Sequence, residues 1–189
     1  MLAQQADVTF LKAIHAHRNT SLDKPMQFIS DSEYLIGTSI PLLFVLSDLT
    51  SHSHQIKNYQ PAIAILSNTA ATYVLKKVIN RPRPAASISF VTPYEDDMNY
   101  SFPSGHSSNA FCLATSMSLY SKQWKIAIPA YIWAGAVGYS RMHLGAHYPS
   151  DVLGGAILGV ASAWISYRVS HWMWGKSSMK QNNLTFSTL

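Results

Sequence analysis

Residues 34–49, which read YLIGTSIPLLFVLSDL, form one of five long apolar stretches that decide the fold of this chain. Asp48 is the only charged residue in this stretch. A helix rises about 1.5 Å per residue, so roughly 20 apolar residues span the hydrocarbon core of a bilayer. The other four stretches lie at about residues 59–75, 107–120, 126–139 and 152–169. Several are shorter than a full span, and short apolar runs also suit the core of a soluble all-α domain.

The scarcity of charge favours the membrane interpretation. Of the 189 residues, 48% are hydrophobic and only 12% are charged, whereas a soluble domain has roughly 25% charged residues. This composition disfavours a disordered chain, a solvent-exposed coiled coil and a protein that coats nucleic acid. Aromatic residues also flank the stretches, as they do at membrane interfaces: Tyr34, Tyr59, Tyr120, Trp124, Tyr139, Trp172 and Trp174. We therefore predict an all-α, polytopic transmembrane bundle with five candidate helices.

Three regions follow from this pattern. Residues 1–33 carry Val8, Leu11 and Ile14 at helical spacing, which predicts a helix lying on the membrane interface, although a soluble cap has the same pattern. Residues 34–174 hold the transmembrane helices, and residues 175–189 form a polar tail that we expect to fray. Gly155 and Gly159 have the spacing that allows close helix packing, but glycines are also common in membrane helices.

If the five stretches cross the membrane one after another in alternating directions, four of their ends lie on the same side. These ends are Lys76, His106, Ser140 and Asp151. Raw counts of Lys and Arg do not orient the bundle. Once Lys76, Arg83 and Arg141 are set aside as functional residues, the count weakly favours this side facing away from the cytoplasm.

The first cluster on this side is KKVINRPRP, residues 76–84. Lys76 lies at a helix end, and Pro82 and Pro84 cannot continue the helix, which leaves Arg83 on an extended segment. A lysine and an arginine presented in this way suit a phosphate. An ordinary cationic flank of a membrane helix has the same composition.

The second cluster, SFPSGH at residues 101–106, directly precedes a helix. Ser104 can cap that helix, Gly105 permits close backbone approach, and the free amides at a helix N-terminus attract anions. His106 then lies beside the anion as a candidate proton donor. The tetrapeptide is also a plausible turn and cap.

The third cluster is SRMHLGAHYPSD, residues 140–151. Asp151 follows His147 by four residues, so its carboxylate can reach one imidazole nitrogen and leave the other as a nucleophile. Arg141 adds a further phosphate ligand. On one continuous helix His143, His147 and Asp151 would share a face and could bind zinc, but Gly145 and Pro149 interrupt such a helix. We therefore predict no metal, and we expect His143 to pack in the loop or support the site.

Together the three clusters resemble the type 2 phosphatidic acid phosphatase (PAP2) superfamily, integral-membrane lipid phosphatases that share their site with vanadium haloperoxidases. The family pattern of Lys, six residues and Arg-Pro matches residues 76–84. Pro-Ser-Gly-His matches residues 103–106, and Ser-Arg, five residues, His, three residues and Asp matches residues 140–151. The resemblance covers about residues 59–169. Bacterial members commonly have six transmembrane helices, so with the resemblance we expect a bundle of five to six, and residues 1–33 would have to supply the sixth.

The resemblance implies a role for each matched residue. His147 attacks phosphorus and forms a phosphohistidine, Asp151 orients it, and His106 protonates the leaving group. The phosphate oxygens are cradled by five further residues, with no cofactor: Lys76, Arg83, Ser104, the Gly105 amide and Arg141. Residues 34–174 then form the catalytic domain.

The resemblance also implies a substrate and a location. The substrate is a phosphorylated membrane lipid such as undecaprenyl diphosphate, phosphatidylglycerophosphate, phosphatidate or lipid A, and no nucleic acid partner is expected. The protein resides in the inner, cytoplasmic membrane with its site on the extracytoplasmic, periplasmic side. From the residues alone, the acidic run Glu95, Asp96 and Asp97 either repels anionic headgroups or is a solvated loop, and we expect His52 and His54 to be solvated loop residues. The alternatives are a non-catalytic phospholipid-binding membrane protein and a vanadate-dependent haloperoxidase-like enzyme.

Overall fold

The computed structural model describes residues 2–51, 56–91, 93–94 and 100–186, and every regular element within these ranges is a helix. The helices in chain order are α1 (Leu2–Ala16), η1 (Thr20–Leu22), α2 (Asp23–Ser51), α3 (Ile56–Ile79), α4 (Pro84–Ser87), α5 (Gly105–Ser121), α6 (Trp124–His143) and α7 (Pro149–Phe186). The prediction of an all-α bundle is confirmed.

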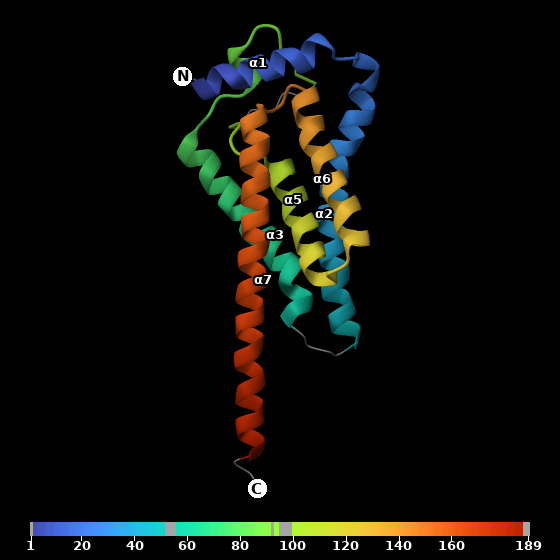
Figure 1. Cartoon of the computed structure of the whole chain (residues 1–189), viewed down its shortest axis with the longest axis vertical. Helices are drawn as coiled ribbons and strands as arrows, with labels where there is room; N and C mark the ends of the chain where they lie inside the picture. Colours follow the sequence, from blue (N-terminus) through green and yellow to red (C-terminus); the bar gives the residue numbers. More distant parts are fainter. Residues whose placement is uncertain (1, 52–55, 92, 95–99, 187–189) are drawn as a thin grey trace.

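Helix α5 is the centre of the bundle. It packs against α7, α6, α3 and α2, and small side chains such as Ala110, Cys112 and Ala114 are buried along it. Helix α1 lies across one end of the bundle (Figure 1). The end of α3, the start of α5, the end of α6 and the start of α7 all lie at this same end (Figure 1), as the threading of the apolar stretches predicts.

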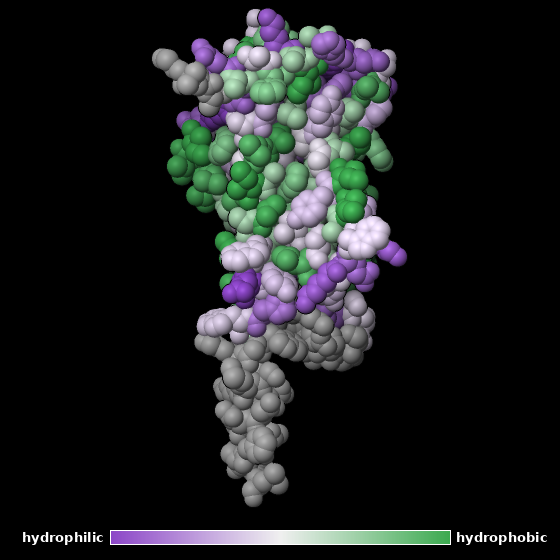
Figure 2. Space-filling model, in the orientation of Figure 1, coloured by the Kyte–Doolittle hydropathy of each residue, from purple (hydrophilic) through white to green (hydrophobic). Residues whose placement is uncertain are grey.

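The outer surface of the bundle is apolar around its middle. Figure 2 shows hydrophobic side chains gathered over the middle of one face, with hydrophilic ones above and below. Leu66 on α3, Ile132 on α6 and Ile157 on α7 are each more than half exposed. Such an outward apolar surface is unfavourable in water and favourable in lipid.

Not every span meets a strict criterion of length and apolarity. Among the described residues, three helices are long and apolar enough to cross a membrane, at Thr20–Thr50, Asn58–Ser87 and Pro149–Met173. Helix α5 has only 17 residues. The count of five to six transmembrane helices stays a prediction.

Two expected boundaries differ from the structure. Helix α2 begins at Asp23, so the boundary expected between residues 33 and 34 falls inside a helix, because the helix runs on through the charged residues Asp31 and Glu33. The sequence predicts a frayed tail from Gly175, whereas α7 continues to Phe186. Lysine, methionine and glutamine are good helix formers, so polarity alone does not end this helix.

Glycines bring α7 close to α5. A Cβ atom on Gly155 would lie 2.5 Å from the Ser104 carbonyl oxygen, and one on Gly159 would collide with the Ser108 carbonyl oxygen. Any larger residue would therefore push the two backbones apart. Of the two interpretations of this glycine pair, the structure supports close helix packing.

Candidate active site

A cavity of about 270 Å³ lies where the predicted clusters meet. Five predicted site residues line it: Lys76 on α3, Arg83 before α4, Gly105 and His106 at the start of α5, and His147 in the loop between α6 and α7. Residues far apart in the sequence thus converge on one site. The other lining residues are Glu33, Tyr34, Thr69, Thr72, Tyr73 and Asn109.

The loop that carries His147 is held by backbone hydrogen bonds. The carbonyl oxygen of Arg141 accepts from the amides of Ala146 and His147, at 3.0 and 3.3 Å. Gly145 has a φ of 73°, a left-handed conformation that glycine adopts without steric cost. This turn ends α6 before His147, so His143, His147 and Asp151 do not share one continuous helix.

The two ring nitrogens of His147 face different groups. Nδ1 lies 3.6 Å from Asp151 Oδ2, and Nε2 lies 3.5 Å from Arg83 Nη1 at the cavity wall. The first distance is long for a hydrogen bond, as catalytic contacts often are before substrate binds. The structure thus places a carboxylate near one ring nitrogen and leaves the other nitrogen at the cavity that Arg83 lines.

Asp151 is fully buried and is held on both carboxylate oxygens. Oδ2 accepts from the backbone amide of Tyr148 at 2.9 Å, and Oδ1 accepts from Arg81 Nη1 at 2.6 Å. Its backbone carbonyl accepts from the Ser104 amide at 3.0 Å. The sequence clusters include Arg81, but sequence reasoning assigned it no role.

The surroundings of His147 favour its neutral form. Burial and the nearby guanidinium groups of Arg83 and Arg141 lower the pKa of His147 from about 6.5 to about 4, against the opposing effect of Asp151. The imidazole of His147 is therefore uncharged at neutral pH and keeps a lone pair on one nitrogen.

The second predicted histidine lies in the first turn of α5. The ring of Tyr34 packs edge-on against His106, with centroids 4.8 Å apart. Ser104 caps this helix as predicted, because its Oγ accepts from the Ser107 amide. A Cβ atom on Gly105 would make only ordinary contact with Thr72, so protein packing alone does not require glycine there.

The predicted cations differ in their placement. Arg83 has the extended backbone expected of it, and its Nη1 donates to the Ala146 carbonyl oxygen at 3.0 Å. Lys76 donates to the Tyr100 carbonyl oxygen. Arg141 is buried, and its Nη1 donates to Ser30 Oγ on α2 at 2.7 Å. Lys76 and Arg83 thus line the cavity, whereas Arg141 is not among its lining residues and instead ties the end of α6 to α2.

Several residues of the site were not anticipated. Glu33 is buried at the cavity although the sequence places it outside the apolar stretch. Asn109 lies one helical turn after His106, and that spacing is the signal that would have found it. His143 contacts Asp23 Oδ1 through Nε2 at 2.9 Å, so it joins α6 to α2 and supports the bundle. Glu95, Asp96, Asp97, His52 and His54 lie outside the described residues.

Comparisons with known proteins show which family this chain is related to. The family model of the PAP2 superfamily matches residues 60–174. Undecaprenyl-diphosphatase BcrC of Bacillus subtilis (strain 168) is 30% identical over 164 residues, which are 84% of this chain and 81% of that protein. Phosphatidylglycerophosphatase B of the same organism is 41% identical over 96 residues, 46% of this chain and 45% of that protein.

Solved structures show the same fold. The transmembrane PAP2 type phosphatidylglycerolphosphate phosphatase from Bacillus subtilis gives a TM-score of 0.71 at 28% identity, covering 90% of this chain and 87% of that chain. Aquifex aeolicus LpxE gives a TM-score of 0.69 at 29% identity, covering 85% of this chain and 94% of that one. The relatives are membrane lipid phosphatases, and this chain, itself a multi-pass membrane protein, belongs to the PAP2 superfamily.

Proposed function

We propose that this protein is a metal-independent lipid phosphatase that works through a phosphohistidine on His147. The observation that carries the proposal is the position of His147, with Nε2 beside Arg83 at the cavity and Nδ1 facing the buried Asp151. His106 lines the same cavity. A nucleophile, an orienting carboxylate and an acid around one cationic cavity fit phosphoryl transfer.

In the first step the phosphate oxygens bind Lys76, Arg83 and the Gly105 amide, with Ser104 and Arg141 completing the cradle. The Nε2 lone pair of His147 forms a bond to the terminal phosphorus. The bond from that phosphorus to its bridging oxygen breaks, and this oxygen leaves with the lipid alcohol of a monoester or with the lipid phosphate of a diphosphate. His106 gives its proton to that leaving oxygen. Asp151 stabilises the positive charge that develops on the imidazole ring.

In the second step a water molecule attacks the phosphorus of the phosphohistidine. His106, now neutral, accepts the proton of that water. The bond between phosphorus and Nε2 breaks, inorganic phosphate leaves, and His147 returns to its neutral form. No electron donor or acceptor is needed in either step.

The position of the cavity supports a lipid substrate. Tyr34 on α2 and Tyr73 on α3 line the cavity and are 62% and 64% exposed, so its wall reaches the apolar outer surface. The extensive match to an undecaprenyl-diphosphatase makes undecaprenyl diphosphate the first substrate to test. We place the protein in the inner, cytoplasmic membrane with the site on the extracytoplasmic, periplasmic side.

The proposal is tested by phosphate release from purified protein in detergent with EDTA present. The panel holds undecaprenyl diphosphate, phosphatidylglycerophosphate, phosphatidate and a lipid A phosphate. We expect phosphate release from at least one of these lipids. When a reaction with radiolabelled substrate is quenched, the protein should carry a phosphate label that is labile in acid and stable in alkali. Loss of the label in His147→Asn, with His171→Asn as the matched control on the far part of α7, identifies the nucleophile.

Two results would contradict the mechanism. Full inhibition by EDTA would require a metal ion, and activity that survives His147→Asn would require another nucleophile. Tight binding of these lipids without any phosphate release would instead favour the non-catalytic alternative.

A further inference from the structure

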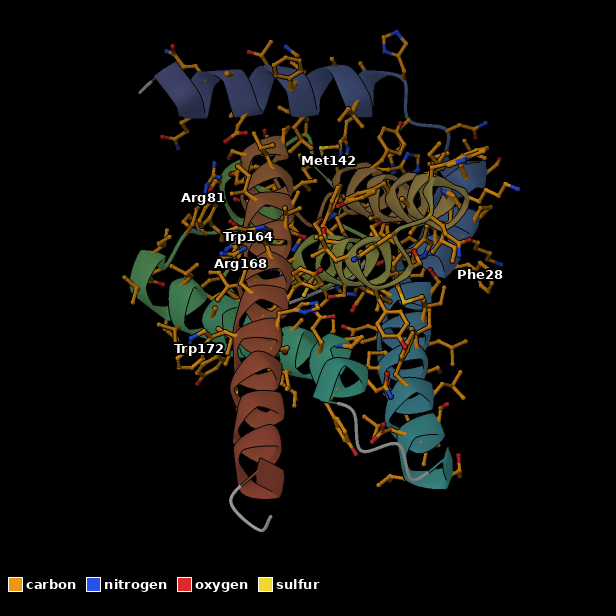
Figure 3. The ribbon with its side chains drawn as sticks, turned by 60° about the horizontal axis from the view of Figure 1, so that its bottom comes forward. Phe28, Arg81, Met142, Trp164, Arg168 and Trp172 are labelled. Atoms are coloured by element: carbon orange, nitrogen blue, oxygen red, sulfur yellow. The ribbon has the colours of Figure 1, made fainter. Side chains whose placement is uncertain are left out.

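Helix α1 is anchored to the segment that carries the proposed nucleophile. Leu11 is completely buried and packs with Tyr148 and Val91. His15 Nε2 lies 3.2 Å from the carbonyl oxygen of Met142. Figure 3 shows α1 running above Arg81 and Met142 across the end of the bundle. The helix therefore contacts both sides of the His147 loop.

The most specific contact of α1 is made by Asp7, whose carboxylate is buried. Asp7 Oδ1 accepts from the backbone amide of Ser150 at 2.9 Å, and Oδ2 accepts from the Ser150 hydroxyl. Ser150 lies in the first turn of α7, where backbone amides have no partner within the helix. Asp7 thus caps α7 from 143 residues away.

Asp7 also holds Arg81. Asp7 Oδ2 accepts from Arg81 Nη2 at 2.7 Å, while Arg81 Nη1 donates to Ser150 Oγ at 2.7 Å and to Asp151 Oδ1 at 2.6 Å. The guanidinium carbon lies 4.1 Å from the centroid of the Tyr148 ring. The planar fork of arginine therefore bridges two carboxylates in one fixed geometry.

This bridge acts on the carboxylate oxygen that does not face His147. Because Arg81 holds Oδ1, the carboxylate of Asp151 cannot rotate freely, and Oδ2 stays between the Tyr148 amide and His147 Nδ1. Lysine in place of Arg81 would supply the charge without the fork. Arg81 is thus placed to hold Asp151 in the orientation in which it faces His147.

We propose that Asp7 and Arg81 are positioning residues for the reaction at His147: Arg81 fixes Asp151 behind the imidazole, and Asp7 on the N-terminal helix fixes Arg81. This inference rests on the proposed function. It extends the functional unit to α1, which lies outside the residues that the family model matches.

The test compares Arg81→Gln, Asp7→Asn and the double variant of the full-length protein in detergent. Asp31→Asn, an exposed acid on α2, is the matched control. Activity is measured against the lipid that the wild type hydrolyses and is divided by the folded fraction from size-exclusion chromatography. We expect each single variant to lose about tenfold to a hundredfold in kcat. KM should stay within about twofold, because neither residue lines the phosphate cavity.

The pH dependence distinguishes positioning from a loss of folding. His147 faces Arg83 before α4, Arg141 on α6 and Asp151 on α7, and Glu33, Lys76 and His106 line the same cavity. Removing the Arg81 cation leaves the Asp151 charge less compensated, which stabilises the imidazolium ion. The acid limb of kcat/KM in Arg81→Gln should therefore move to higher pH, whereas unfolding would scale the whole profile.

The double variant tests whether Asp7 acts through Arg81. If it does, Asp7→Asn causes little further loss in the Arg81→Gln background. Additive losses, a raised KM, or single variants that match Asp31→Asn in kcat and pH profile would overturn the inference while leaving the proposed function intact. A wild type that releases no phosphate from any lipid would overturn both.

Discussion

His147 is buried beside two arginines, and this setting determines how the residue responds to pH. Burial and the positive charges lower the pKa of His147 to about 4. A histidine in water is half protonated near pH 6.5 and would lose much of its nucleophilic form in mild acid. The buried ring keeps its lone pair well below that pH.

We therefore expect the acid limb of kcat/KM to lie near pH 4 rather than near 6.5. Activity falls as the pH drops through this range, because protonation removes the lone pair that attacks phosphorus. Arg83→Gln removes one of the charges that disfavour the imidazolium ion, so its limb should move upward while its KM rises. The measurement is a pH profile with a soluble phosphate ester, and a wild-type limb near 6.5 would contradict the interpretation.

Sequence reasoning found the residues whose chemistry is local. His147 and Asp151 are four positions apart, and Ser104 directly precedes its helix, so short-range spacing was enough to find them. The roles of Asp7 and Arg81 could not be predicted in this way because their partners lie 143 and 70 residues away. Glu33 is not predicted because a charged residue ordinarily marks the end of an apolar stretch. No local pattern carries this long-range information.

At the scale of elements, the contact between α5 and α7 is set by two glycines. The Ser104 amide also donates to Asp151, so the two helix starts that carry His106 and Asp151 are joined at this contact. The spacing of Gly155 and Gly159 suggested close packing, but only the geometry showed which helix fills the space they leave.

Gly159→Ala should destabilise the protein by about 1–3 kcal/mol, because the added methyl group would meet backbone atoms of α5, including Cys112 N at 2.8 Å. Gly135→Ala on α6 is the control, since no atom lies within 4 Å of its added methyl group. Alanine there should be neutral or stabilise the helix by up to about 1 kcal/mol. Thermal unfolding in detergent measures both, and equal effects would argue against a tight contact between α5 and α7.

Helix ends were the least predictable feature of the elements. Apolarity marks the part of a helix that faces lipid, but α2 extends upstream to Asp23 and α7 extends downstream to Phe186. Both extensions are polar segments with ordinary helix-forming residues. The hydrogen-bonded helix is longer than its apolar portion, so an apolar count locates a helix without giving its ends.

At the scale of the whole molecule, the site lies at one end of the bundle and the turn between α5 and α6 lies at the other (Figure 1). The sequence predicted this common end for four helix termini, because connections alternate between the two sides of a membrane. The scarcity of charge predicted the apolar outer surface. Neither pattern predicted that α1 would dock on the site end.

The proposed orientation predicts which end is accessible from outside the cell membrane. Ser89→Cys, at the site end, should react with a membrane-impermeant maleimide in cells whose outer barrier, where present, has been opened. Lys122→Cys, at the α5–α6 turn, should react only after lysis. The native Cys112 is fully buried, so the unmodified protein is the background control. The reverse labelling pattern would place the site in the cytoplasm.

The anchoring of α1 also has a consequence for biosynthesis. Asp7 and Leu11 are made before helices α2 to α6, yet their partners Tyr148 and Ser150 are made only after those helices. Helix α1 therefore lacks its contacts with Tyr148 and Ser150 while the intervening segments enter the membrane. A nascent chain that stalls before the loop between α6 and α7 lacks both the proposed nucleophile His147 and its support Asp151, so the proposed site is completed only after helices α1 to α6 have been made.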